Sequence, residues 1–388
     1  MSLLGSPGKQ SRRSVSKTIR STLSLPDREH SVHHSSRLKP NTWSWRTWLV
    51  ATIVTASVII GVVVTSVLGA RANAYPDYYR IEYQLQDTYT GDNFFSHFSY
   101  FTGDDPTHGF VHYVDAEGSA THNLTQISSN SNVSTLTSDT KTAILRVDTS
   151  DTLATSGRRS VRITSTKTYS TGLFIFDVLH IPYGCGTWPA LWLTDPSNWP
   201  ENGEIDVIEA VNTGNTGNHV TLHTSEGCKM GTKRRRKQTG KGTTYNCWNA
   251  TNGNVGCGVT GPPPSFGEAF NAHGGGIYAL EVRSEGIRVW LFDRDSVPSD
   301  LISQQPDPSM WPTPLADFPH LECDVDRHFR NMSIIANIAL CGDWAGREDV
   351  FGKSAGCEGT CEEWVAQRGG TFGEAFWEFG GWWVYGGV

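Results

Sequence analysis

Three carboxylates fall within six residues of this chain: Glu204, Asp206 and Glu209. In a β-strand alternate side chains share a face, so Glu204 and Asp206 would point the same way. Glu209 stands at an odd separation from Glu204 and would face the core of a regular strand. One extra residue near Val207-Ile208, a β-bulge, would return Glu209 to the face of the other two carboxylates, and bulges are frequent beside active sites. The segment therefore predicts a bulged strand with three carboxylates on one side.

Two carboxyl groups about 5 Å apart are the machinery of a retaining glycosidase, in which one attacks the anomeric carbon and the other protonates the leaving oxygen. Like charges at this spacing raise at least one pKa and so supply a protonated acid near neutral pH. Asp206, between the two glutamates, can hydrogen-bond the nucleophile and modulate its charge. The alternatives are the solvated polar face of an ordinary strand and a cation site.

The elements expected to position these groups are β-strands. From about Tyr75 onward the sequence is built of alternating or continuous apolar runs bounded by Gly, Pro, Asn and Asp. We expect strands at residues 143–147, 160–164, 172–179, 204–210, 220–224, 277–283, 287–292, 333–340 and 375–385. Two of them flank Ser284-Glu285-Gly286, which predicts a hairpin. Many short strands without a break in composition predict one all-β domain of two packed sheets.

Charge and cysteine content separate the two ends of the chain. Residues 1–46 hold nine Lys/Arg and two Asp/Glu, whereas the remainder carries a net charge of −14, which argues against a nucleic-acid partner. All eight Cys lie in the acidic part and favour disulfides formed in an oxidising compartment, although their spacing leaves the pairing open. Glycosylation sequons at Asn123, Asn132, Asn249 and Asn331 agree with that compartment.

Residues 47–70 are 24 consecutive uncharged residues and are mostly apolar. As a helix they would span roughly 36 Å, more than the ~30 Å hydrocarbon layer. Three Trp residues lie at the entry, and Lys and Arg precede it. This pattern predicts a single-pass signal anchor, a basic disordered cytosolic tail at residues 1–46 and an extracellular body. The alternative is a cleaved signal peptide, with cleavage near Ala72–Ala74 and secretion of the body.

Further motifs surround the acidic strand: Gly-Thr-Trp-Pro-Ala-Leu-Trp at 186–192, Asn198-Trp199-Pro200, and the segments 203–212, 220–225, 341–346 and 101–115. With these motifs, the sequence from about Tyr75 to Val388 resembles glycoside hydrolase family 16, and within it the fungal laminarinase-type endo-β-1,3(4)-glucanases. The resemblance implies that residues 75–388 form a concanavalin A-like β-jelly-roll sandwich with a concave glycan cleft.

The same resemblance implies roles for individual residues. Glu204 would be the nucleophile, Asp206 the assisting carboxylate and Glu209 the acid/base. The side chains implied to bind sugar are Trp188, Trp192, Trp199, His223 and Trp344. The basic run at residues 233–237, in a Cys-bounded loop, and the membrane anchor depart from the secreted degraders of this family.

The function expected from these signals is a monomeric, retaining endo-1,3(4)-β-glucanase that acts on β-glucan by double displacement. It would require no cofactor or catalytic metal, and a structural calcium is not indicated. The alternatives are a cell-wall β-glucan transglycosylase and a non-catalytic glucan-binding protein on the same fold. Among the other candidates, Trp290, Trp382 and Trp383 are expected in the core, and Arg162 is expected to reach the cleft.

Overall fold

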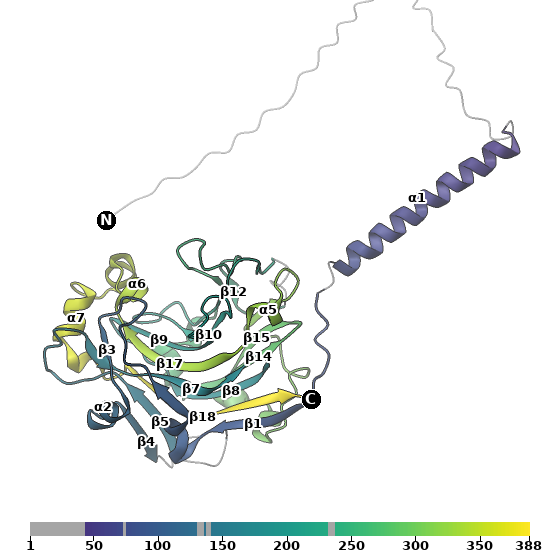
Figure 1. The fold of residues 1–388 in the computed structure, drawn as a ribbon. Helices are drawn as coiled ribbons and strands as arrows, with labels where there is room; N and C mark the ends of the chain where they lie inside the picture. Colours follow the sequence, from purple (N-terminus) through teal and green to yellow (C-terminus); the bar gives the residue numbers. More distant parts are fainter. Residues whose placement is uncertain (1–42, 73–74, 130–135, 137–140, 232–236) are drawn as a thin grey trace, which may run out of the picture. The chain divides into compact units, whose positions relative to one another are not determined.

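A computed structural model describes residues 43–72, 75–129, 136, 141–231 and 237–388 of the 388-residue chain. The chain divides into two compact units, residues 1–67 and 68–388. Helix α1 (Trp45–Ala72) contains the predicted apolar segment 47–70 (Figure 1). Its part Trp45–Ala70 is long and apolar enough to cross a membrane. The expectations for residues 1–42, for Asn132 and for most of the basic run 233–237 concern residues outside the described ranges.

The second unit is built on two eight-stranded sheets. The first has the order β16 (Ala316–Pro319), β15 (Gly286–Asp293), β14 (Gly276–Arg283), β8 (Gly172–His180), β18 (Phe376–Gly387), β5 (Lys141–Arg146) and β4 (Thr125–Ser129), and β1 (Tyr83–Tyr89) also pairs with β18. The second has the order β12 (Lys241–Gly242), β13 (Cys257–Thr260), β11 (His219–His223), β10 (Glu204–Glu209), β9 (Thr187–Thr194), β17 (Met332–Leu340), β7 (Arg162–Tyr169) and β2 (Phe98–Tyr100). Strands β3 (Val111–Tyr113) and β6 (Arg158–Ser160) form a small parallel pair.

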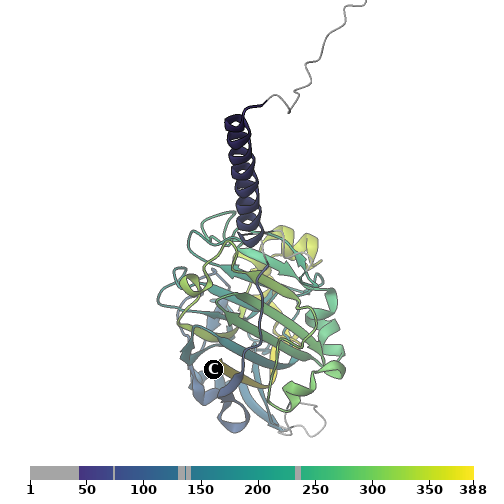
Figure 2. The same ribbon diagram turned by 90° about the vertical axis from the view of Figure 1, so that its right-hand side faces the viewer.

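The two sheets pack face to face in curved layers (Figures 1 and 2). The core between them includes Phe174 and Tyr278 from the first sheet and Leu191, Ile205 and Ile334 from the second, all without exposed surface. Alternate residues of these strands point inward, which is the pattern that the apolar runs predict. The expected all-β sandwich is confirmed.

The nine expected strands are present, with shifted ends. The expected hairpin is β14–β15, in which Arg283 pairs with Gly286 across the turn. The expected strand at 160–164 is divided at Val161 between β6 and β7. The sequence did not predict the central strand β9 or the peripheral strands β1 to β4, β12, β13 and β16. The peripheral strands are short or carry mixed side chains, and β9 contains Pro189, a residue that argues against a central strand.

Short helices lie in the connections between strands, and they too were not predicted. They are the α-helices α2 (Ala116–Thr121), α3 (Gly267–Ala272), α4 (Ser299–Ile302), α5 (Val325–His328), α6 (Gly342–Ala345) and α7 (Cys361–Gln367), the 3₁₀ turns Gly91–His97, Pro263–Ser265, Arg294–Ser296 and Gly369–Phe372, and a π turn at Asp349–Ser354. Runs of three to seven residues are too short to show a helical apolar period.

The outer face of the first sheet carries a second apolar cluster that includes Trp290 and Trp383, so their expected core positions are confirmed, while Trp382 lies in the main core. The segment that begins at Tyr75 lies over this face. Tyr78 and Tyr83 donate hydrogen bonds from their hydroxyls to Asp317 and Glu281, each at 2.9 Å. This segment is therefore an integral part of the sandwich, bound to the first sheet.

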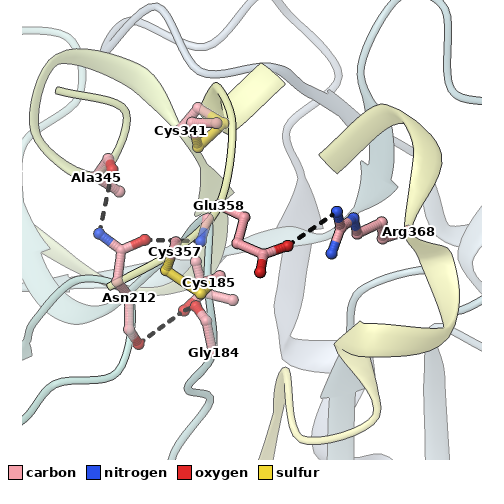
Figure 3. Close-up of a disulfide and its surroundings, with 11 residues drawn as sticks. Gly184, Cys185, Asn212, Cys341, Ala345, Cys357, Glu358 and Arg368 are labelled. Atoms are coloured by element: carbon pink, nitrogen blue, oxygen red, sulfur yellow. Dashed lines mark hydrogen bonds and ion pairs between the residues drawn. A yellow bond between two sulfur atoms is a disulfide. The ribbon is translucent and has the colours of Figure 1, made fainter. Parts of the chain in front are cut away.

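The eight cysteines form four disulfides, as expected from their number and placement: Cys185–Cys357, Cys228–Cys323, Cys247–Cys257 and Cys341–Cys361. Cys185 lies just before β9, and Cys357 lies just before α7 (Figure 3). The bridge Cys341–Cys361 therefore closes the segment 341–361 into a loop, and the bridge Cys185–Cys357 joins this segment to the start of β9.

Candidate active site

Strand β10 carries the three carboxylates and is bulged. Its register against β9 shifts between Asp206 and Ile208, which makes Val207 an extra residue. Val207 and Ile208 both face the core and have no exposed surface. The predicted bulge is confirmed, and it leaves Glu204, Asp206 and Glu209 on the opposite face of the second sheet.

His223 of β11 lies directly across from Glu204. Its Nε2 is 3.5 Å from Oδ2 of Asp206 and 4.0 Å from Oε1 of Glu204. Burial favours the neutral imidazole, but the hydrogen bond to Asp206 and the charge of Glu204 outweigh it and raise the pKa of His223 to about 10. The imidazolium therefore persists at neutral pH, and its Nδ1–H donates to Oδ1 of Asn254 at 3.0 Å. Sequence reasoning placed His223 here but missed Asn254.

The two glutamates are both difficult to ionise. Burial and, next, the charge of Asp206 raise the pKa of Glu204 to about 7 and the pKa of Glu209 to about 8. The charge of Glu204 also raises the pKa of Glu209, so the two carboxyl groups interact. At Glu204 the strongest influence that lowers the pKa is the charge of the His223 imidazolium. At Glu209 it is the hydrogen bond from the indole of Trp188. The pKa values of both carboxyl groups therefore lie well above the usual range, and the two groups titrate as an interacting pair.

An aromatic wall, formed by Trp188, Trp344 and His219, adjoins Glu209. The indole Nε1 of Trp188 donates to Oε1 of Glu209 at 2.8 Å. The ring of Trp344 meets Trp188 edge to face at 5.7 Å and meets His219 edge to face at 5.4 Å. Both Trp residues are half-buried, so each keeps surface for a ligand.

Buried Asn212 holds this wall together (Figure 3). Its Oδ1 accepts from the N–H of Gly186 at 2.7 Å, and its Nδ2 donates to the carbonyl of Ala345 at 3.1 Å. Asn212 therefore joins the start of β9, which leads to Trp188, to helix α6, which carries Trp344. The disulfides Cys185–Cys357 and Cys341–Cys361 tie down the same two segments.

Trp192 stands opposite Asp206 in the sheet. Its Nε1 donates to Oδ1 of Asn337 at 2.8 Å. The guanidinium of Arg162, an expected cleft residue, lies 4.9 Å from the ring of Trp192 and 4.7 Å from the ring of Phe101. Arg162 is 9% exposed, and its Nε has no hydrogen-bond partner among the described residues. Its charge contributes to lowering the pKa of Glu204, which places it near the carboxylates.

Trp199 projects from the loop between β9 and β10 and is 41% exposed. Buried Asp195 anchors this loop by accepting hydrogen bonds from the N–H of Ser197 and from the side-chain amides of Asn198, Asn202 and Asn331 at 2.7–3.1 Å. Burial raises the pKa of Asp195, but these donors outweigh it and hold the pKa at about 2. Asp195 therefore holds in place the loop that presents the exposed indole of Trp199. The sequence did not identify Asp195 as a residue of the site.

The carboxylates also form a donor set that could hold a cation. Among the described residues, Glu204, Asp206 and His223 bring one potential ligand atom each within 4.8 Å of one another. The proton on His223 already supplies a positive charge at this position, because the pKa of the imidazole is raised. A metal would have to displace that proton before it could bind the ring nitrogen.

A pair of interacting glutamates on a bulged strand, bordered by Trp side chains, is the arrangement expected of the glycoside hydrolase class of enzymes. Residues 98–385 match the profile of the XgeA-like catalytic domain of glycoside hydrolase family 16, and the chain belongs to this family. The resemblance read from the sequence is confirmed.

Two curated relatives illustrate the similarity. A probable glycosidase of Schizosaccharomyces pombe is 46% identical over 306 residues, which are 78% of this chain and 69% of that protein. An endo-1,3(4)-β-glucanase of Emericella nidulans is 37% identical over 309 residues, which are 76% of this chain and 46% of the relative. The chain therefore spans less than half the length of the second relative.

Two solved structures share the fold. Laminarinase 16A of Phanerochaete chrysosporium, determined with 6-O-glucosyl-laminaritriose in its donor and acceptor sites, is 43% identical, covers 78% of this chain and 99% of its own, and has a TM-score of 0.72. An elongating family 16 β-1,3-glucosyltransferase is 37% identical, covers 78% of this chain and 100% of its own, and has a TM-score of 0.71.

Proposed function

We propose that this chain is a retaining endo-1,3(4)-β-glucanase. The observation that carries the proposal is the bulge at Val207, which puts Glu204 and Glu209 on one face where their charges interact. The substrate class is supported by the glucanase relative and by the laminarinase bound to a β-1,3-linked oligosaccharide.

In the proposed first step the carboxylate of Glu204 attacks the anomeric carbon, the bond to the leaving oxygen breaks, and Glu209 gives its proton to that oxygen. In the second step Glu209 takes a proton from water, the water oxygen attacks the same carbon, and Glu204 leaves as a carboxylate. The assignment of the two roles follows the family resemblance. It is supported by the raised pKa of both carboxyl groups, because one of the pair can then hold a proton at neutral pH while the other is ionised.

We infer that Asp206 acts through charge and position. It lies between the glutamates, raises the pKa of both, and is paired with the His223 imidazolium. Trp199 is proposed to stack on a sugar ring because its indole is exposed beside the pair, and it contributes a hydrogen bond that helps to lower the pKa of Glu204. Trp192, Trp188 and Trp344 are proposed to line the rest of the cleft.

We propose in addition that α1 anchors the enzyme in a membrane, with residues 1–46 in the cytosol and residues 75–388 outside. The support is the length and apolar surface of α1, the positive charge before it and the four disulfides after it. Fusion of a reporter to either end, with protease protection of sealed vesicles, tests this orientation. A protease-sensitive N-terminus at the cell surface would contradict it.

The activity is tested with the full-length chain in detergent on laminarin and mixed-linkage β-glucan. We expect Glu204→Ala and Glu209→Ala each to abolish reducing-end release, and Trp192→Ala mainly to raise KM. Glu268→Gln, at an exposed carboxylate on α3, is the control and should keep full activity. Near-normal activity of Glu204→Ala would show that the assignment is wrong.

A transglycosylase remains the second candidate, because an elongating glucosyltransferase shares the fold at 37% identity. Both reactions pass through the same glycosyl-enzyme and differ in whether water or a glucan hydroxyl accepts the sugar. Product sizing after incubation with a defined laminari-oligosaccharide separates them. Products longer than the supplied chain indicate transfer, and only shorter ones indicate hydrolysis.

A further inference from the structure

The bulge in β10 creates a local hydrogen-bonding problem. Strand β10 pairs with β11 from Glu204 to Asp206, and the paired register ends there. The two backbone groups next to the extra residue, the carbonyl of Val207 and the N–H of Glu209, therefore have no partner strand on that side. Backbone groups at such a buried position must find other partners.

One side chain satisfies both groups. The N–H of Glu209 donates to Oδ1 of Asn218 at 2.8 Å, and Nδ2 of Asn218 donates to the carbonyl of Val207 at 2.8 Å. The amide of Asn218 thus occupies the place of a neighbouring strand at the bulge. Asn218 has no exposed surface, so water does not compete for these bonds.

Asn218 is itself held in place by its backbone. Its N–H donates to Oγ of Ser265 at 2.9 Å, and its carbonyl accepts from the N–H of Gly261 at 2.8 Å. Oγ of Ser265 in turn donates to the carbonyl of Pro262 at 2.6 Å. The segment 261–265 therefore holds the backbone of Asn218 in place next to the bulge.

We propose that Asn218 is the positioning residue for Glu209, and that it fixes the bulge so that the carboxyl group of Glu209 meets the glycosidic oxygen. The inference rests on the proposed function, in which Glu209 is the acid. Asn218 lies beside the bulged strand and acts through the N–H of Glu209. Small displacements of a catalytic group are costly, on the order of 10²-fold in rate for about 1 Å.

The test exploits the need for a proton on the leaving group. A glucan leaving group requires the acid, whereas a 2,4-dinitrophenyl leaving group departs without one. For Asn218→Ala in the full-length chain, we expect kcat/KM on laminarin to fall roughly 10- to 100-fold, and kcat/KM on a dinitrophenyl β-laminaribioside to fall less than about 3-fold. Equal losses on the two substrates would overturn the proposal, because general structural damage affects both.

Two variants serve as controls. Asn271 makes the same pair of amide-to-backbone bonds, to the N–H and carbonyl of Ile181 at 2.9 and 3.0 Å, but does not contact β10. Asn271→Ala should lower thermal stability and leave the ratio of the two kcat/KM values unchanged. Glu209→Ala should show the strongest dependence on the leaving group. If it shows none, the assignment of the acid fails, and the proposed function is at fault.

Asn218→Asp keeps the test usable if the alanine variant does not fold. Its carboxylate can accept from the N–H of Glu209, but only its protonated form can also donate to the carbonyl of Val207. Relative to the unmodified chain, its kcat/KM on laminarin should recover as the pH is lowered from about 8 to about 5. If the kcat/KM of Asn218→Asp relative to that of the unmodified chain does not change with pH, the proposal that this side chain must bond both backbone groups is contradicted.

Discussion

The indole Nε1 of Trp188 donates a hydrogen bond to Oε1 of Glu209 across 2.8 Å. The resemblance to the family implies that Trp188 binds sugar, and the contact adds a second role. A donor to the carboxylate stabilises its ionised form, and it is the strongest influence that lowers the pKa of Glu209 against burial and the charge of Asp206.

Trp188→Phe should therefore move the alkaline limb of the pH profile of kcat/KM to higher pH. The substitution keeps an aromatic ring and removes the N–H, so Glu209 would hold its proton to a pH above its present pKa of about 8. The pH dependence of laminarin hydrolysis measures the shift. Trp290 lies on the first sheet, away from Glu209, and its indole donates to the carbonyl of Pro312. Trp290→Phe removes this bond and should leave the alkaline limb in place.

Asp206→Asn should shift both limbs of the profile to lower pH. The charge of Asp206 raises the pKa of Glu204, whose ionised form is needed on the acid side, and the pKa of Glu209, whose protonated form is needed on the alkaline side. Removal of one negative charge favours ionisation of both groups. A pH–rate profile with unchanged limbs would show that Asp206 does not act through its charge.

Asp195→Ala should raise KM more than it lowers kcat, because it releases the loop that presents Trp199. It should also lower thermal stability, since each hydrogen bond to a charged group is worth about 2 kcal/mol. The folded-state pKa lies below the ordinary value, so the stabilisation by Asp195 is full above pH 4 and is lost as the pH falls through about 2. Calorimetric melting between pH 2 and pH 6 checks this for the unmodified chain.

The matched control for Asp195 is Asp300→Ala. Asp300 accepts from the N–H of Asp307 and from the indole of Trp311, both at 2.7 Å, outside the cleft. We expect a smaller loss of melting temperature, because Asp300 has two donors and Asp195 has four, together with an unchanged KM. A raised KM in both variants would mean that general loosening, and not the Trp199 loop, is responsible.

Replacement of both Cys185 and Cys357 by Ala should reduce stability by about 3 kcal/mol and raise KM. This disulfide ties the start of β9 to the segment that follows Trp344, so its loss loosens the aromatic wall beside Glu209. Replacement of Cys228 and Cys323, a pair outside that wall, should cost stability without the change in KM. Denaturant melts and initial rates on laminarin measure both effects.

Local patterns in the sequence were sufficient for several features. The alternation of Glu204 and Asp206 against the odd position of Glu209 predicted the bulge, because side-chain direction in a strand depends on residue parity alone. The apolar runs predicted most of the central strands for the same reason, but not β9. The flanking motifs identified the family.

Other features depend on contacts between distant segments, and no local pattern carries them. Asn218 and Asn254 became relevant only when the register of β10 and β11 was known. The four donors to Asp195 include Asn331, which is 136 residues away along the chain. The peripheral strands pair at sheet edges, where one-sided exposure leaves a weak apolar signal.

By itself the sequence determined the identity of the acidic residues, the bulge needed to align them, the presence of disulfides and the apolar helix, since each follows from residue type and spacing. Only the tertiary structure decided how strongly burial and neighbouring charges raise the pKa of each glutamate, which cysteines pair, and which buried amide bridges the bulge. Those outcomes depend on burial and on neighbours contributed by other strands, and such distances exist only after the sheets have packed.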